Sequence, residues 1–228
     1  MTTSLVVTES IALTKTKAPA LPFAPVEYDR PYQDTLNNIL RQYFNQIDNL
    51  IGQLSLSTGG SGFYMPYGAF QDTTTQTIAA NTATVMKFNT TDFANDVSIV
   101  SGSKITVAKA GIYNLQWSGE FQNSDNAIHD INIWLRQDGP GAGVDIPGSK
   151  GVISVPARKS AAANEEAHNL YGWNYFVSLN AGEFVEIWWA TDSALVTLKA
   201  FPATTTPVAT PSTASVVATM TFVSALPA

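Results

Sequence analysis

The chain shows two successive patterns of apolar residues, each with its own repeat. Between residues 35 and 54, apolar side chains recur at alternating steps of three and four, which is typical of an amphipathic helix or a coiled-coil seam. From Phe63 onward, apolar and polar residues alternate, which predicts strands. The glycine-rich run STGGSG between the two patterns predicts a domain boundary.

The changes of pattern divide the chain into four predicted segments. These are an extended N-terminal arm over residues 1–28, a helix over 29–56, a glycine-rich hinge over 57–62 and a β domain over 63–228. Pro19, Pro22 and Pro25 favour extended backbone in the arm, which is either a disordered tail or a segment that orders against a partner. Pro31 suits the first turn of the helix, where its missing N–H breaks no hydrogen bond.

The predicted helix carries an apolar seam without charged flanks. Asn and Gln, not Glu and Lys, border the seam, so interhelical ion pairs do not select its partner. Two arrangements stay open: the helix packs on its own β domain, or it associates with its copies around a symmetry axis. The residues expected to form a trimer interface or anchor are Leu36, Leu40, Tyr43, Phe44, Ile47, Leu50, Ile51 and Leu54.

The second pattern predicts a β sandwich of about eight to ten strands. The segment YGWNYFVSL, the turn LNAGE and the segment EFVEIWWA predict a hairpin. GIYNLQWSGEF and INIWLR also alternate. Further strands are expected at residues 67–72, 84–89, 104–107, 150–155, 195–199 and 215–223.

Two tryptophans are candidates for surface contacts. Trp134 falls in the polar phase of its strand, so it is expected to face away from the core. Trp188 and Trp189 are adjacent, and a strand sends neighbours to opposite faces, so the core accepts only one of them. We therefore single out Trp134 and Trp188 as candidate glycan or interface contacts.

Composition narrows the classes of function. The chain has no cysteine, 13% charged residues, a net charge of −6 and no basic run, which argues against disulfides and against nucleic acid as a partner. The N-terminus lacks the charged and apolar regions of a signal peptide, and no run reaches the ~18 apolar residues of a membrane span. We expect a soluble protein that is not conventionally secreted and has no membrane partner.

The sequence contains few candidates for catalytic or metal-binding residues. Two histidines, His129 and His168, offer little to a catalytic triad or a metal site, and the carboxylates show no spacing typical of a glycosidase. GPGAGVDIPGSKG is glycine-rich, but no helix or Lys-Ser/Thr pair follows it, so we interpret it as a surface loop. The sequence predicts no catalytic residue, no metal and no cofactor: the protein is expected not to be an enzyme.

Three segments carry a resemblance to a known superfamily. ITVAKAGIYNLQWSGEF, with Ala110, Gly111 and Tyr113, is followed by VSLNAGEFVEIWW and then by SVVATMTFV. Together they resemble the jelly roll of the tumour necrosis factor (TNF) and complement-type globular heads. The resemblance implies an all-β, TNF-like jelly-roll sandwich that forms trimers, with a stalk entering at one end. The short coiled-coil helix after the extended arm fits such a stalk.

The combination of arm, helix and Thr/Asn/Gly-rich jelly roll also looks like structural proteins of tailed bacteriophages. This resemblance implies a homotrimeric virion protein, assembled in the host cytoplasm, with the major capsid protein or tail and adaptor proteins as partners. A capsid decoration or short head fibre is favoured, because the chain has no long shaft. The alternative is a tail fibre or knob that binds a host receptor or surface glycan.

Overall fold

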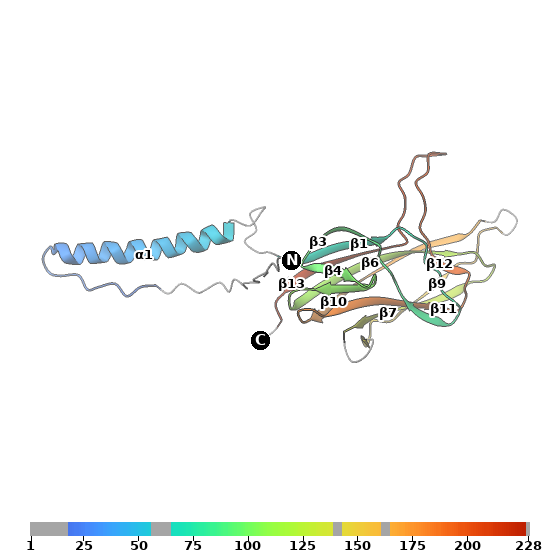
Figure 1. Ribbon diagram of the computed structural model, residues 1–228, viewed down its shortest axis with the longest axis horizontal. Helices are drawn as coiled ribbons and strands as arrows, with labels where there is room; N and C mark the ends of the chain where they lie inside the picture. The colour runs from blue at the N-terminus through green and yellow to red at the C-terminus, as the bar shows by residue number, and fades with distance from the viewer. Residues whose placement is uncertain (1–17, 56–64, 139–142, 161–164, 227–228) are drawn as a thin grey trace, which may run out of the picture. The chain divides into compact units, whose positions relative to one another are not determined.

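A computed structural model describes residues 18–55, 65–138, 143–160 and 165–226 of the chain (Figure 1). The chain divides into two compact units, Met1–Tyr64 and Met65–Ala228. The expected hinge at 57–62, and residues 1–17 of the expected arm, lie outside the described residues. Within the described ranges, no helix combines the length and apolar content needed to cross a membrane.

The predicted helix is confirmed as α1 (Arg30–Ser55), a continuous 26-residue helix. It starts where Pro31 can occupy the first turn, and the Gln33 amide donates to the Asp29 carbonyl at 3.1 Å. The segment before it is coil, and the Tyr32 hydroxyl donates to the Pro22 carbonyl at 3.4 Å. The end of the arm therefore lies beside the first turn of α1.

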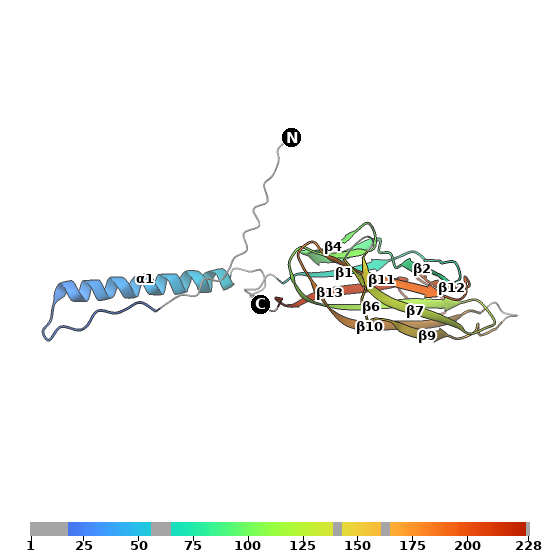
Figure 2. The same cartoon turned by 90° about the horizontal axis from the view of Figure 1, so that it is seen from below.

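The second unit consists of two antiparallel sheets packed face to face (Figures 1 and 2). In the first, which we call sheet A, the order is β10-β6-β13-β1-β3, and β12 also pairs with β6. Its strands are β1 (Tyr67–Asp72), β3 (Thr90–Asn95), β6 (Gly111–Asn123), β10 (Ala167–Leu179), β12 (Val196–Leu198) and β13 (Val216–Ser224).

The second sheet, sheet B, has the order β4-β5-β11-β7-β8, with β2 on β11 and β9 on β7. Eight of the strands form the two four-stranded layers β1-β13-β6-β10 and β5-β11-β7-β9. The two layers confirm the predicted all-β jelly-roll sandwich. The strands of sheet B are β2 (Thr82–Val85), β4 (Val97–Val100), β5 (Lys104–Val107), β7 (His129–Gln137), β8 (Val144–Asp145), β9 (Gly151–Val155) and β11 (Phe184–Thr191).

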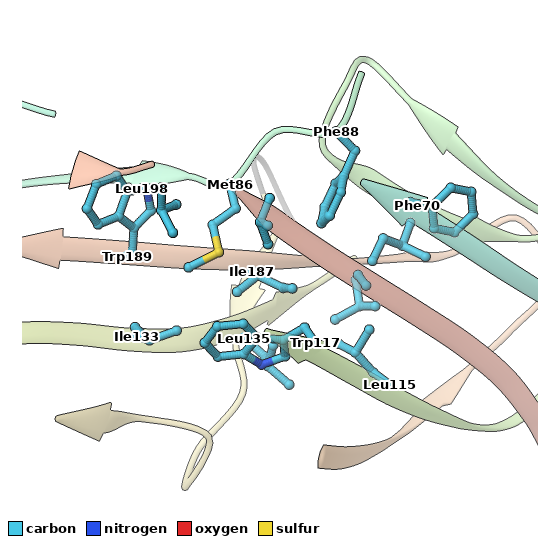
Figure 3. Close-up of a cluster of buried hydrophobic side chains, with 14 of the residues drawn as sticks. Phe70, Met86, Phe88, Leu115, Trp117, Ile133, Leu135, Ile187, Trp189 and Leu198 are labelled. Atoms are coloured by element: carbon cyan, nitrogen blue, oxygen red, sulfur yellow. The ribbon is translucent and has the colours of Figure 1, made fainter. Parts of the chain in front are cut away.

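The core lies between the sheets and is filled from both (Figure 3). Trp189 of sheet B packs on Phe121 of sheet A with ring centroids 6.0 Å apart. Tyr113 is fully buried and donates to the Lys109 carbonyl at 2.7 Å. Burial, with a smaller contribution from Asp96, raises the pKa of Tyr113 to about 12. The alternation in GIYNLQWSGEF therefore places its aromatic residues inward, as predicted.

The predicted hairpin between YGWNYFVSL and EFVEIWWA is wrong. The turn exists, with Gly182 in the left-handed region at φ 87° and the Glu183 amide donating to Asn180. However, β10 pairs with β6 in sheet A, whereas β11 pairs with β2, β5 and β7 in sheet B. Alternation shows which face of a strand is apolar but not which strand lies beside it, and this turn crosses between the layers.

The predicted number of strands is too low, since the described residues contain thirteen. The additional strands β3, β4 and β8 are short, and β3 reads TTDFAN with little apolar alternation. These strands lie at or near the sheet edges, where one side of the backbone pairs and burial is slight. A hydrophobic pattern is weak in such strands because backbone pairing, not burial, defines them.

Candidate functional site

Helix α1 presents the apolar side chains that were expected to form an interface. Within the described helix residues, none is fully buried: Phe44 is 56% exposed and Ile51 55% exposed. Leu36, Leu40, Tyr43 and Ile47 are half-buried, while the side chains of Leu50 and Leu54 lie outside the described residues. A helix with an apolar stripe gains most of its stability by packing that stripe, so α1 offers an apolar face for packing against another element.

The outward side of β6, β10 and β13 forms a broad surface, which we call the sheet A face. Exposed apolar residues on it include Leu170 at 65%, Phe176 at 57% and Val217 at 40%. In register they lie opposite Glu120, Asn114 and Ser118 of β6. Among the outward residues of these three strands Glu120 is the only carboxylate, and there is no Lys or Arg. This near absence of charge is unusual for a surface in contact with water.

The outward side of sheet B is built differently, around the two candidate tryptophans. Trp134 of β7 and Trp188 of β11 are direct partners in the strand register, with ring centroids 6.4 Å apart and planes inclined by 33°. Of the adjacent residues Trp188 and Trp189, Trp189 is fully buried, so Trp188 is the one that faces outward. The structure therefore brings together the two tryptophans that sequence reasoning treated separately.

Charged groups fix the orientation of these rings. Asp145 Oδ1 accepts from the Trp134 Nε1–H at 2.9 Å and from Arg136 Nε at 2.8 Å. The Arg136 guanidinium also lies 4.1 Å from the Trp188 ring centre, a cation–π contact. The hydrogen bond from Arg136, followed by that from Trp134, lowers the pKa of Asp145 below its usual value. The carboxylate thus stays ionised at neutral pH and holds both partners.

Trp188 has its own buried support. Its Nε1–H donates to Glu186 Oε2 at 3.1 Å, and the other Glu186 oxygen accepts from the Ser103 hydroxyl at 2.8 Å. Glu186 is only 5% exposed, so its carboxyl oxygens are largely removed from water and rely on these donors for hydrogen bonds. Glu186 precedes Trp188 by two residues, and residues at this spacing share one face of a strand. The sequence therefore contained the signal that could have predicted their contact.

An open pocket of about 510 Å³ lies beside Trp134. It is lined by Asn132, Trp134, Asp145, Ile146, Pro147, Gly148, Lys150 and Ala190. Its volume falls in the range of small-molecule sites, and its wall combines one aromatic ring with a few polar groups. Five of its residues come from GPGAGVDIPGSKG, the segment interpreted as a plain surface loop, so sequence reasoning missed this contribution to the pocket.

The two histidines lie elsewhere. His129 Nε2 lies 2.8 Å from Asp125 Oδ2, and its Nδ1 lies 2.9 Å from Asp192 Oδ1. Burial by itself lowers the pKa of His129, but the hydrogen bonds to Asp125 and Asp192 raise it on balance. His168 on β10 makes an edge contact with the Phe201 ring at 5.1 Å.

Neither histidine belongs to a metal-binding group. In the part of the chain that the structure describes, no cluster of three or more His, Cys, Asp or Glu side chains could hold a metal ion. His129 uses both ring nitrogens on carboxylates, which joins the loop after β6 to the loop after β11. We interpret this group as a structural link between two loops.

Comparisons with known proteins give little beyond the fold. No protein-family description matches the chain. No curated protein matches it either. Among solved structures, the chain is similar to Eiger TNF from S. frugiperda, with a TM-score of 0.49 and 7% sequence identity over 73% of this chain and 97% of that one. At this identity the similarity concerns the fold alone.

Proposed function

We propose that this protein is a non-enzymatic structural protein of a bacteriophage virion that assembles as a homotrimer. The N-terminal arm and α1 attach it to the particle, and the β unit is displayed as a head, either as a capsid decoration or as a short head fibre. Its partners are its own copies and virion proteins such as the major capsid protein or a tail or adaptor protein.

The observation that carries the assembly role is the sheet A face. Exposure of Leu170, Phe176 and Val217 on one face of a sheet is costly in water, because each apolar side chain gains roughly 1.5–3 kcal/mol when it is fully buried. Depletion of charged residues is typical of the centre of a protein–protein interface. The sheet A face is therefore suited to burial against another copy of the β unit.

Helix α1 supports the same proposal independently. A helix in a protein gains most of its stability by packing its apolar face, and the apolar stripe of α1 is not buried within its own unit. Three copies would bury Leu36, Leu40, Tyr43 and Ile47 along a common axis, with Leu50 and Leu54 continuing the seam. Phe44 and Ile51 would remain on the flank, available for the arm or for the particle.

The virion assignment rests on the resemblance to tailed-phage structural proteins described above. An extended arm, a short stalk helix and a jelly-roll head with few charges are the parts expected of a decoration module, which favours a site on the capsid or near it over the end of a tail.

Sedimentation velocity on the full chain at micromolar concentration tests the assembly step. We expect a trimer, and a monomer would overturn the proposal. Attachment is tested by incubating purified particles with the full chain and with a variant lacking residues 1–56. We expect the shortened protein to keep its β fold but to lose attachment. Retained attachment would place the docking surface on the β unit.

The pocket beside Trp134 favours a second candidate function, the binding of a host-surface glycan by the displayed head. A pyranose ring has one flat side of C–H bonds and a rim of hydroxyls, and the pocket offers an indole beside amide and carboxylate groups. This role is compatible with a structural protein and would make the head a receptor-binding module. A glycan array that gives no signal with folded protein would contradict it.

A further inference from the structure

The polar groups around the Trp134 pocket are not all used within the protein. Within the described residues, the Asn132 amide has no hydrogen-bond partner and Lys150 has no ion-pair partner. Asp145 uses Oδ1 for both Trp134 and Arg136, which leaves Oδ2 without a partner in the same part of the chain. An amide, an ammonium and a carboxylate oxygen are therefore free to bind a ligand.

The strand register places these groups around the indole. Gly151 pairs with Ile133, so Lys150 comes at the level of Trp134 on the neighbouring strand. Asn132 pairs with Ala190 of β11, and the small side chain of Ala190 leaves space beside Asn132 on the outward face. A ring lying over Trp134 would thus have Lys150 on one side and Asn132 along its edge, with space above Ala190.

Two charged residues line the pocket, Asp145 and Lys150. Asp145 is neutralised by Arg136 at 2.8 Å, so the pair contributes little net charge. Lys150 is the remaining charged group of the lining, in a protein whose net charge is −6. An ammonium without an internal partner favours an anionic group on the ligand.

We propose that the Trp134 pocket binds an acidic saccharide, one that bears a carboxylate of the uronic or sialic acid type. The C–H face of the sugar stacks on Trp134, and its carboxylate pairs with Lys150. Ring hydroxyls donate to Asp145 Oδ2 and accept from the Asn132 amide. This inference rests on the second candidate function, glycan binding by the head, and names the class of glycan.

Two residues act as positioning residues in this arrangement. Asp145 holds the indole of Trp134 through Nε1, and Arg136 holds Asp145 while covering Trp188. The indole is therefore fixed before a ligand arrives, which reduces the entropy lost on binding. Gly148 lies beside the pocket with φ 79°, a left-handed conformation that glycine adopts readily because it has no side chain.

The test is a paired glycan array with the full-length protein. Each acidic glycan, carrying uronic or sialic acid, is printed beside the same glycan with its carboxylate reduced to an alcohol. We expect binding to an acidic member and weaker binding to its reduced partner. Lys150→Gln should lower the affinity for the acidic glycan about two- to fivefold, as for an exposed ion pair. Trp134→Ala should lower it about tenfold or more.

Lys87→Gln is the matched control, because Lys87 is exposed and does not line the pocket. It should bind like the natural protein, and thermal unfolding should show that every variant is folded. Equal binding of acidic and reduced glycans that Trp134→Ala abolishes would overturn the acidic class but leave glycan binding intact. No binding to any glycan, or binding unaffected by Trp134→Ala, would overturn both the inference and this pocket as the glycan site.

Discussion

The outward faces of the two sheets differ in how their large side chains are held. On the sheet A face, Leu170 and Phe176 project without charged neighbours other than Glu120. On sheet B, Trp134 and Trp188 are tied by hydrogen bonds to Asp145 and Glu186. An apolar surface gains by being covered, whereas aromatic rings oriented by polar groups gain by binding a defined ligand. This difference is the basis on which we propose assembly through one face and recognition through the other.

The largest expected effect is a difference in the free energy of unfolding between substitutions on the inward and the outward face of sheet B. Trp189→Ala should lower the free energy of unfolding by about 3–5 kcal/mol, because it leaves a cavity between the sheets against Phe121. Trp188→Ala should cost only about 1–2 kcal/mol, since that ring is partly exposed. Urea unfolding monitored by circular dichroism measures both. Equal costs would contradict the assignment of the two rings to opposite faces.

A gentler substitution sharpens the same contrast. In the described part of the chain, the buried Nε1 of Trp189 has no hydrogen-bond partner. Trp189→Phe removes an unsatisfied donor along with some packing, so its cost should be well below that of Trp189→Ala, at roughly 1–2 kcal/mol. Urea unfolding again gives the value. A cost equal to that of Trp189→Ala would show that ring volume, not burial of an aromatic, decides stability at this position.

The next effect tests the sheet A face as an interface. Phe176→Glu should weaken trimer formation about tenfold or more, because it buries a carboxylate in an apolar contact. Val100→Glu is the control on sheet B, where Val100 is 44% exposed and Lys104 lies opposite in the register. Sedimentation across a concentration series measures the association constants. Equal association of the two variants would place the trimer contact elsewhere, with α1 as the alternative.

A smaller effect concerns Arg136 on sheet B, which contacts both Asp145 and Trp188. Arg136→Gln should raise the pKa of Asp145 towards its ordinary value, because Arg136 is the main cause of the lowered pKa. It should also lower the free energy of unfolding by about 0.5–1 kcal/mol through loss of the contact with Trp188. Carboxyl resonances followed by NMR during a pH titration report the pKa. An unchanged pKa would mean that Trp134 alone holds the carboxylate.

The smallest effect lies away from both faces, at His129. The raised pKa of His129 stabilises the fold at pH values below about 6.5, and this contribution is lost as pH rises through the higher folded pKa. The lowered pKa of Asp125, due first to His129, stabilises the fold above about pH 4 and is lost in more acidic solution. The link is therefore strongest between these limits.

His129→Gln measures that contribution. The melting temperature should fall by about 1–2 °C at pH 5.5 and by less at pH 8.5, where the natural imidazole is neutral. Differential scanning calorimetry at both pH values gives the difference. A larger loss at pH 8.5 would reverse the assigned sign and would mean that neutral His129 is the stabilising form.

Much of this molecule follows from residue order alone. Steps of three and four predict α1, and strict alternation predicts which residues of β6 and β7 face the core. The same rule places Trp134 outside and allows only one of Trp188 and Trp189 inside. These features are local, because the helix period and the alternation of a strand are properties of consecutive residues.

Other features depend on contacts between distant segments. Alternation did not reveal that β10 joins β6 and that β11 joins β7, because pairing depends on the packing of whole layers. The pocket is likewise a product of that pairing. Its residues come from β7 with Asn132 and Trp134, from β11 with Ala190, from β8 with Asp145, and from the turn before β9 with Lys150. The sequence determined the character of each face, and only the tertiary structure decided which side chains meet on it, because those meetings are set by sheet register across long separations in the chain.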